Sequence, residues 1–409
     1  MKNSQNKFVT YFKYYIIFII SKIFKNNYSL KRKELLLFFI KFNIKNKLDI
    51  HSIYGATDHA TKHFLKIKKK IINYSNNYNF LKIFTFKRSK NNISRTELLG
   101  ANKRLNFIKT INFSQSKSYV GQYKNIKIHN WHGFPIVFYD NKIIKKISSK
   151  YAPLSISKEI LTTKEKKINA GFLLFSDVDI QNYCHFILDV FSMTYFLKKI
   201  NNKKIIILLP KFNLSRYHNF FFKIIKKSGY KIYFMDQNES ILVKNFYAIE
   251  DFYHPVGLVN KYILNYLRFL VNSNTKIQKK ILWITRKKRR VLNEKQIVKR
   301  LKINYSVTIV DLEKISVAEQ INLFNKHEVY IGPHGAGFTN IVFINSVYKR
   351  KLIEIFPEDL GTPTYCMISS SQNIKHYSYV GKSIHTFQSN YSNILVNEKE
   401  FLDLAKKII

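Results

Sequence analysis

From residue 171 to the end of the chain, short apolar runs alternate with segments whose apolar residues recur at helical spacing. The runs Gly171–Phe175 and Ile205–Leu209 are uninterrupted, which is typical of strands buried on both faces. Between them, residues 185–200 are apolar at helical spacing. A strand, a helix and a strand in this order predict a parallel sheet with helices on its faces.

The same alternation continues to the C-terminus. The further strands that it predicts are 231–235, 241–249, 281–285, 306–310, 329–331, 351–356 and 375–380. The further helices are 215–227, 261–271, 294–301, 317–326, 338–344, 363–371 and 398–408. Upstream, residues from about 95 to 150 alternate apolar and polar side chains, which predicts short strands.

Two domains are expected, because a chain of 409 residues exceeds one ordinary core. A segment with Pro and Gly, 251–260, is typical of a hinge. We therefore expect an N-terminal α/β domain over 91–255 and a C-terminal one over 256–409. Residues 1–90 are predicted to form a basic, mostly helical extension. The expected class is α/β, with two doubly wound, Rossmann-like domains facing a cleft.

The segment 329–340 predicts a buried strand, a glycine turn and the start of a helix. Gly335 and Gly337 lack a Cβ atom, so the backbone can bend there and approach a ligand closely. The first amides of a helix have no partner within it, and the helix dipole favours negative charge. Phosphate or sugar oxygens are therefore suitable ligands, with His334 in the turn as a donor. A tight turn without a ligand is the alternative.

Charged residues also occur where strands end or are buried. Arg286 follows a predicted strand and opens a basic run, and guanidinium groups bind phosphate in a bidentate fork. Arg286 and His334 should share the carboxyl edge of the sheet, where such folds bind ligands. Glu354 lies inside an apolar strand and needs hydrogen bonds there, for example from sugar hydroxyls. The alternatives are a solvated basic loop and an edge strand that faces water.

His185 and Asp189 are four residues apart, so they share one face of a predicted helix. A carboxylate beside an imidazole fixes its tautomer and raises its basicity, so the pair could deprotonate an acceptor hydroxyl. A structural histidine beside an exposed aspartate is the alternative. Asp177 and Asp179 form an Asp-x-Asp pattern, which could hold a divalent metal on a sugar diphosphate or only cap a helix.

The chain has 70 Lys and Arg against 25 Asp and Glu, a net charge of +45. This excess favours a polyanionic partner, although abundant Lys, Asn, Ile, Phe and Tyr also indicate an A+T-rich coding bias. Cys184 and Cys366 lack ligand-type spacing, which argues against a disulfide scaffold or structural zinc and favours a reducing compartment.

The N-terminal apolar runs 14–20 and 35–40 are far shorter than the roughly 20 residues of a membrane-spanning helix. No small-residue cleavage site follows the first run, so a secretory signal is not expected. The runs predict helices packed on the globular body or a basic amphipathic segment on an anionic membrane face. We expect a cytoplasmic protein, with peripheral attachment to the inner membrane face as an option.

Three segments resemble glycosyltransferase family 61. Residues 182–189 are similar to that family's Asn-x-x-His-x-x-x-Asp signature, and residues 283–294 to its strand ending in Ser-Arg with a following Arg-Arg-x-x-Asn-Glu. Residues 332–340 together with 352–357 carry the most specific likeness. The departures put packing rather than chemistry in doubt: Phe186, Thr285 and Phe338 stand where many members have Trp, Ser and Leu.

The resemblance implies a GT-B-type fold and inverting transfer from a nucleotide sugar, with no metal and no cofactor. It implies that His185 and Asp189 face the acceptor and that one of them is the base. The donor and diphosphate residues carried over by position are Arg286, Arg290, His334, Gly335, Ala336, Gly337, Asn340 and Glu354. Asn182, Asn293 and Glu294 also occupy motif positions. The implied acceptor is a glycan or lipid-linked glycan of a surface polysaccharide, of capsular or lipopolysaccharide type.

Two other functions stay open. A non-enzymatic basic protein that binds nucleic acid or an anionic membrane would fit the charge. However, the charge is spread along the chain, and no zinc-ligand spacing or other nucleic-acid signature accompanies it. A metal-dependent transferase using Asp177 and Asp179 is the second.

Overall fold

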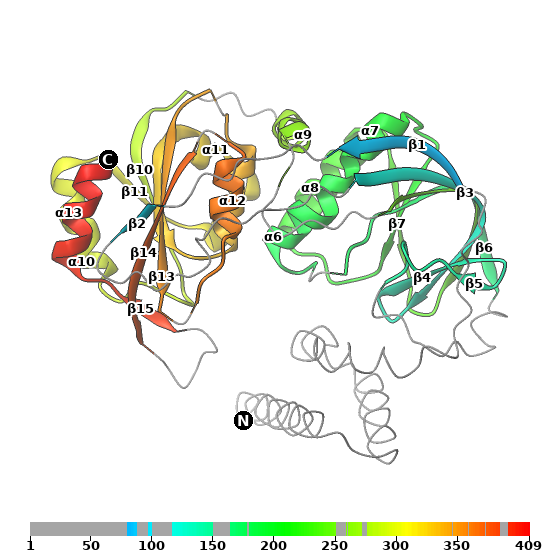
Figure 1. Cartoon of the computed structure of the whole chain (residues 1–409), viewed down its shortest axis with the longest axis horizontal. Helices are drawn as coiled ribbons and strands as arrows, with labels where there is room; N and C mark the ends of the chain where they lie inside the picture. Colours follow the sequence, from blue (N-terminus) through cyan, green and yellow to red (C-terminus); the bar gives the residue numbers. More distant parts are fainter. Residues whose placement is uncertain are drawn as a thin grey trace, which may run out of the picture.

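The computed structural model describes residues 80–87, 97–99, 117–149, 164–177, 180–250, 259, 261–271, 276–345, 347–358, 360–372, 374–384 and 392–409. These residues form two α/β units, each built on its own sheet (Figure 1). The mixed α/β class predicted from the periodicity is confirmed. The predicted helices 317–326 and 398–408 have the same bounds in the structure.

The first unit has a mixed sheet with the order β5-β4-β3-β9-β6-β7-β8, and β1 pairs with β3. Strands β9, β6, β7 and β8 are parallel, whereas β1, β3, β4 and β5 pair antiparallel. The strands are β1 (Phe80–Lys87), β3 (Lys117–Trp131), β4 (Phe134–Tyr139), β5 (Lys142–Ile143), β6 (Glu165–Leu173), β7 (Ile206–Pro210), β8 (Lys231–Met235) and β9 (Ser240–Glu250).

This sheet corrects the prediction of a fully doubly wound first domain. Two-residue turns join β3 to β4 and β4 to β5, and such short connections can only link antiparallel neighbours. The turn residues His132, Gly133, Asp140 and Asn141 all have positive φ, as these hairpin turns require.

The predicted helical extension over 1–90 is wrong for residues 80–87. Their sequence, Phe-Leu-Lys-Ile-Phe-Thr-Phe-Lys, is aromatic and β-branched, which favours a strand, and β1 pairs with β3 over its whole length. The rest of the proposed extension, 1–79 and 88–90, lies outside the described residues. Strand β2 (Glu97–Leu99), expected in the first domain, pairs with the sheet of the second unit instead.

The second unit has the sheet order β11-β10-β12-β13-β14-β15, with β2 beside β14. Strands β10, β11, β12, β13 and β14 are all parallel, which agrees with the predicted doubly wound character. The strands are β10 (Lys279–Thr285), β11 (Val307–Asp311), β12 (His327–Pro333), β13 (Arg350–Pro357), β14 (Ile374–Ile384) and β15 (Asn393–Leu395).

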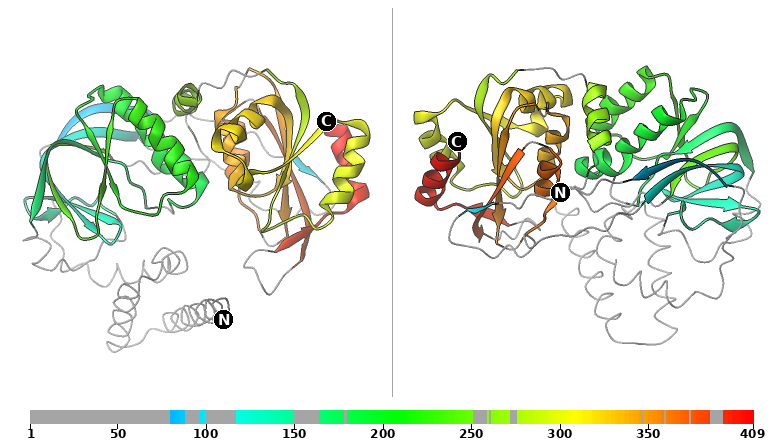
Figure 2. Two further views of the ribbon diagram at one scale, coloured as in Figure 1. Left: turned by 180° about the vertical axis from the view of Figure 1, so that it is seen from behind. Right: turned by 45° about the horizontal axis from the view of Figure 1, so that its top comes forward.

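Helices cover both faces of the second sheet (Figure 2). Helices α10 (Glu294–Asn304) and α13 (Glu398–Ile408) lie on the outer face. The inner face, toward the first unit, carries α11 (Val317–Lys326), the 3₁₀ helix η5 (Ala336–Phe343) and α12 (Thr364–Ser370). The glycine turn therefore opens a 3₁₀ helix on the face that meets the first unit.

The helices of the first unit lie on its side that faces the second unit (Figure 1). They are α6 (Tyr183–His185), the π-helix η2 (Phe186–Val190), the 3₁₀ helix η3 (Phe191–Met193), α7 (Thr194–Ile200) and α8 (Arg216–Lys227). Helix α9 (Lys261–Val271) follows them in the chain and lies between the units.

One apolar core runs through both units. It includes Phe186 and Phe221 of the first unit together with Leu282, Tyr330 and Leu352 of the second. The Phe221 ring stacks on the Phe343 ring with centroids 5.6 Å apart. Burial at about 25 cal/mol per Å² of apolar surface therefore stabilises the junction itself, as well as each unit.

A polar contact accompanies this shared core. The Tyr183 hydroxyl of α6 donates to Asn340 Oδ1 of η5 at 2.8 Å. Asn340 is fully buried, and its amide nitrogen donates to Gln320 Oε1 and to the Gly337 carbonyl. Loss of the hydroxyl would leave the Asn340 oxygen buried without this donor.

We predict that Tyr183→Phe lowers the free energy of unfolding by about 1–3 kcal/mol, the usual cost of an unsatisfied buried acceptor. The measurement is urea denaturation followed by fluorescence. Tyr217→Phe is the matched control, because its hydroxyl donates to the exposed Gln181 carbonyl within the first unit. Equal effects of the two substitutions would show that the contact between the units contributes nothing.

Candidate active site at the junction of the two units

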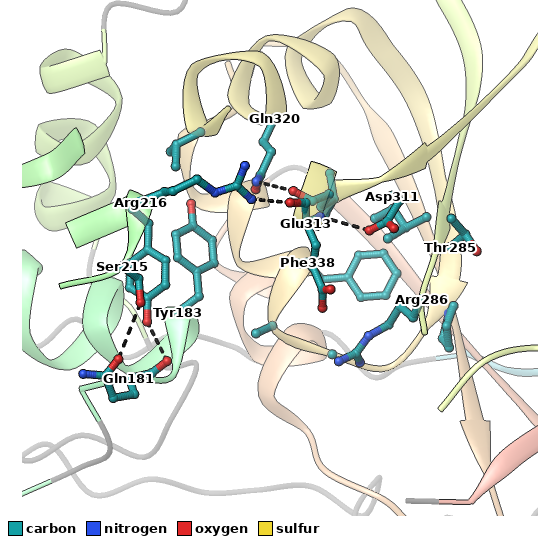
Figure 3. A pocket seen from close by; sticks show the side chains of 18 residues that line it. Gln181, Tyr183, Ser215, Arg216, Thr285, Arg286, Asp311, Glu313, Gln320 and Phe338 are labelled. Carbon is teal, nitrogen blue, oxygen red and sulfur yellow. Dashed lines mark hydrogen bonds between the residues drawn. The ribbon is translucent and has the colours of Figure 1, made fainter. Parts of the chain in front are cut away.

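A cavity of about 330 Å³ lies between the two units (Figure 3). The first unit contributes Gln181, Tyr183, Ser215, Arg216 and Tyr217. From the second unit come residues at the carboxyl ends of β10, β11 and β12, including Arg286, Asp311, Glu313, Gly335, Ala336 and Gly337. This is the sheet edge at which open α/β folds bind ligands. The sequence prediction that Arg286 and the glycine turn share one edge is confirmed.

Close approach explains the glycines of the turn. A Cβ atom on Gly335 would lie 1.6 Å from Arg286 Nη1, so no side chain fits while the guanidinium holds its place. A Cβ on Gly332 would lie 2.7 Å from the Ile284 carbonyl oxygen, and one on Gly337 2.6 Å from Leu312 Cδ1. The backbone at Gly335 is extended, so the position of the Arg286 guanidinium, and not dihedral freedom, favours glycine there.

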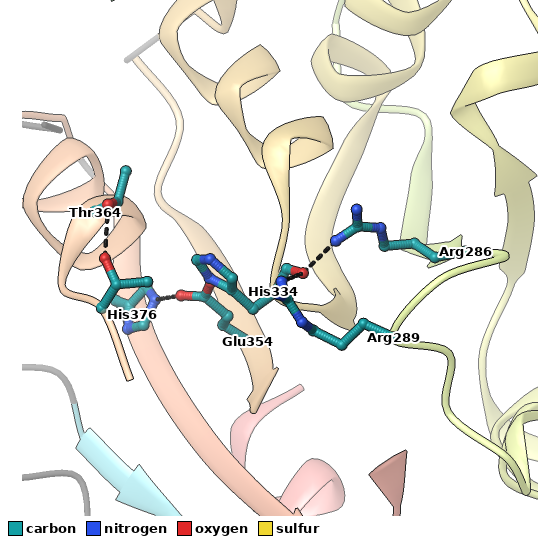
Figure 4. Close-up of polar contacts among 7 residues, drawn as sticks. Arg286, Arg289, His334, Glu354, Thr364 and His376 are labelled. Atoms are coloured by element: carbon teal, nitrogen blue, oxygen red, sulfur yellow. Dashed lines mark hydrogen bonds and ion pairs between the residues drawn. The ribbon is translucent and has the colours of Figure 1, made fainter. Parts of the chain in front are cut away.

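Two arginines fix the backbone of this turn (Figure 4). Arg286 Nη1 donates to the His334 carbonyl, and Arg289 Nη1 donates to the same oxygen at 3.1 Å. Arg289 has positive φ, which turns the loop after β10 back toward the sheet edge. Arg286 thus brings its positive charge to the cavity wall, and Arg289 shares the same carbonyl acceptor.

The structure places the rest of the Arg-Arg-x-x-Asn-Glu segment away from the cavity. Arg290 is exposed, and its backbone pairs with Asn393 and Ile394. Asn293 bonds the backbone of Val396 in both directions. Glu294 accepts from Trp283 Nε1 at 2.8 Å. These contacts brace the corner between β10 and α10, and Arg290, for which the sequence predicts contact with the diphosphate, does not line the cavity.

Behind the turn, His334, Glu354 and His376 form a buried chain across β12, β13 and β14 (Figure 4). His334 Nδ1 lies 2.5 Å from Glu354 Oε1, and His376 Nε2 lies 2.8 Å from Glu354 Oε2. Gly332 and Glu354 are register partners, as are Leu352 and His376. Because side chains two positions apart share a face of a strand, all three point to the inner face.

The Glu354 side chain is fully buried on an inner strand, which corrects the alternative of an edge strand facing water. Burial alone would raise the pKa of Glu354, but His334 and His376 hold that pKa below its ordinary value. Both carboxylate oxygens already contact histidine rings. Contact with donor hydroxyls, which the sequence predicted for Glu354, would therefore have to pass through His334.

The predicted pair of His185 and Asp189 forms in the first unit. His185 Nδ1 and Asp189 Oδ2 are 2.8 Å apart. The His185 side chain is 25% exposed and that of Asp189 only 5%, so His185 is the more accessible member of the pair. Asp189 lies in the π-helix η2, a local widening that is frequent at functional sites.

A buried polar cluster separates the two imidazole–carboxylate pairs. Burial raises the pKa of the Cys184 thiol to about 12, the charges of Asp189 and Glu354 add to the rise, and hydrogen bonds with Thr339 and Tyr365 oppose it. Thr339 and Tyr365 contact this thiol, and the Tyr365 ring lies 5.3 Å from that of His334. Neighbours of His185 and of His334 thus meet in this cluster, although neither histidine is among the residues that line the cavity.

Other predicted residues have structural partners. Asn182 caps α6 by accepting from the Cys184 amide at 2.9 Å, and Asn340 bonds within the protein as described above. Asp177 accepts from Ser149 Oγ, whereas Asp179 lies outside the described residues. Within the described ranges, no group of three or more His, Cys, Asp or Glu side chains could hold a metal ion. No helix within those ranges is long and apolar enough to cross a membrane.

Comparison with known proteins bears on this site. Residues 183–351 match the family model for glycosyltransferase 61. The match confirms the resemblance to glycosyltransferase family 61 and covers less than half of the chain. It includes His185, Asp189, Arg286 and His334, and ends before Glu354 and His376. It points to a glycosyltransferase that acts on a sugar donor and an acceptor. Among curated proteins, none matches this chain.

Sequence reasoning missed His376, Arg289 and the acidic end of the cavity at Asp311 and Glu313. His376 carries no local signal, because only the register of β13 and β14 brings it to Glu354. Arg289 and Arg290 are adjacent, and the turn geometry alone decides which one faces inward. Asp311 had a usable signal, since it directly follows the predicted strand 306–310.

We predict that the stability difference between the wild type and Glu354→Gln depends on pH. A folded-state pKa below the ordinary 4.5 means that the carboxylate contributes stability above about pH 4.5 and loses it as the pH falls through the folded value. The difference in Tm between the two proteins should therefore be largest near pH 7 and shrink below pH 4.5. Glu328→Gln is the control, since Glu328 pairs with Lys280 at a half-buried site of β12. A difference that stays constant with pH would contradict an ionised Glu354.

Proposed function

We propose that the protein is an inverting, metal-independent glycosyltransferase with a GT-B-like pairing of two α/β units. It moves a sugar from a nucleotide-sugar donor to a glycan or lipid-linked glycan acceptor in surface polysaccharide synthesis. The observation that carries this proposal is the cavity at the carboxyl edge of the second sheet, where Arg286 lies against a side-chain-free Gly335. The family match over that edge supports it.

The cavity is polarised, which orients a donor within it. Arg286 lines one part, and Asp311 and Glu313 line another, where Arg216 of the first unit donates to the Glu313 backbone carbonyl. A diphosphate belongs with the guanidinium, which can meet two of its oxygens at once. The carboxylates repel phosphate but accept hydrogen bonds, so ribose hydroxyls belong at their end. His334 then lies beside the leaving group, next to Gly335.

Chemistry begins in the first unit. His185 Nε2 takes the proton from an acceptor hydroxyl, and Asp189 orients the ring through Nδ1. The acceptor oxygen attacks the anomeric carbon as the bond from that carbon to the diphosphate oxygen breaks. The diphosphate leaves with the electron pair, and Arg286 stabilises its charge. One displacement inverts the anomeric configuration.

The charge of the chain supports a location for this reaction. With +45 at neutral pH, the protein would be held near anionic lipid headgroups. We place it in the cytoplasm, peripheral to the membrane, where lipid-linked acceptors are presented.

We predict that Arg286→Ala abolishes thermal stabilisation by the nucleotide sugar that stabilises the wild type, whereas Arg290→Ala retains it. The reason is that Arg286 lines the cavity and the neighbouring Arg290 faces solvent. A screen of nucleotide sugars by thermal shift measures this, because a ligand that binds only the folded state raises its Tm. Stabilisation lost equally in both variants would indicate diffuse electrostatics. No stabilisation by any nucleotide sugar, with tight salt-sensitive binding to DNA or anionic vesicles, would favour the non-enzymatic alternative.

We predict that His185→Gln lowers kcat by about 10²–10⁴-fold, the usual contribution of a general base, and leaves the KM for the donor nearly unchanged. Asp189→Asn should lower kcat less, because His185 remains. His218→Asn is the control, since His218 accepts from the Ser215 amide as part of the α8 cap and does not face the site. Product analysis by NMR should show inverted configuration, and retention would refute the single displacement.

A further inference from the structure

The buried chain of His334, Glu354 and His376 contains a residue for which the reaction above has no use. His376 lies on β14 with its side chain 2% exposed, and it cannot touch a substrate. Placing an ionisable ring there is costly unless it is well bonded. The bond it makes, 2.8 Å to Glu354 Oε2, joins it to the residue that holds His334.

The carboxylate determines which ring atoms carry protons. An ionised carboxylate only accepts hydrogen bonds, so each ring nitrogen that faces Glu354 must donate. His334 Nδ1 and His376 Nε2 therefore both carry hydrogen. In the described part of the chain, His334 Nε2 has no protein partner and is not among the buried unsatisfied atoms. Nε2 is thus the ring atom that His334 presents to a ligand.

Other contacts hold the faces of the His334 ring and the backbone of His334. Phe356 stacks on it with ring centroids 5.2 Å apart, and Tyr365 lies 5.3 Å away at a tilt. Arg286 and Arg289 hold its carbonyl oxygen from the other side. With these contacts in place, the torsion of the imidazole is set by the position of the Glu354 carboxylate, and that position depends on His376.

We propose that His376 is a positioning residue for His334. It fixes the Glu354 carboxylate so that His334 keeps hydrogen on Nδ1 and presents the lone pair of Nε2, which accepts a hydrogen bond from a hydroxyl group of the bound donor. This role rests on the proposed glycosyl transfer only for its effect on rate, since the tautomer of His334 exists without substrate. The charged and titratable groups that face this chain are Arg286, Arg289, Cys184 and Tyr365.

The test combines NMR with kinetics on the full-length protein. In ¹⁵N,¹³C-histidine-labelled protein, with His334 assigned by its loss in His334→Gln, the wild type should show one tautomer with hydrogen on Nδ1. His376→Leu removes the donor and should give mixed tautomers. It should also lower kcat by roughly 10–100-fold, the usual effect of removing a group one contact behind a catalytic one. The KM for the donor should change little.

A conservative variant separates positioning from packing. His376→Gln places an amide nitrogen where Nε2 was and should restore the single tautomer and most of kcat. His376→Asn is too short to reach Glu354 and should behave like His376→Leu, so it serves if the leucine variant does not fold. His327→Gln is the matched control, because His327 is a buried histidine at the other end of β12 that contacts the Leu323 carbonyl and Thr308. It should lower Tm without changing the His334 signals.

Each outcome has one meaning. A single Nδ1–H tautomer in His376→Leu or His376→Asn would overturn the proposal, whether or not the protein transfers sugar. A changed tautomer in a protein that binds no nucleotide sugar would leave the positioning role standing and refute the proposed function. A changed tautomer with unchanged kcat would show that His334 takes no part in the transfer of the sugar.

Discussion

The buried carboxylate of Glu354 is the constraint on which the site depends. A full negative charge on an inner strand is tolerated only with strong hydrogen-bond donors on both oxygens, and His334 and His376 supply them. Meeting that requirement fixes the end of β12, because His334 is also the residue whose carbonyl receives Arg286 and Arg289. The buried Glu354 inside the sheet therefore determines where the Arg286 and Arg289 side chains lie at the edge of the sheet.

The junction of the two units positions the first unit relative to this sheet edge. The shared apolar core and the contact of Tyr183 with Asn340 place α6, which ends at His185, against η5, which follows the glycine turn. A general base and a leaving-group site must be held to within a fraction of an ångström for efficient transfer. A continuous apolar core between the two units holds them in a fixed position better than a solvent-filled cleft would.

Periodicity predicted most helices and strands from 205 onward, because buried parallel strands and amphipathic helices leave strong local patterns. The glycine turn, Arg286 and the pair of His185 and Asp189 were also visible, since each depends on residues near in sequence. Features that depend on pairing between residues far apart in the sequence could not be predicted. The antiparallel half of the first sheet depends on β3, the strand β1 was mistaken for helix, and His376 meets Glu354 only through the register of β14.

Arg289 and Arg290 are adjacent in sequence, but their side chains lie in different surroundings. Both side chains have the same charge and the same reach, and a sequence pattern ranks them equally. The positive φ at Arg289 turns one toward the His334 carbonyl, while the backbone of the other pairs with Asn393 and Ile394. In a chain of net charge +45, positive charge alone identifies no site. Arg286 is distinguished by the backbone of Gly335, which has no side chain and approaches the guanidinium closely. Gly335, rather than Arg286, therefore indicates where the site lies.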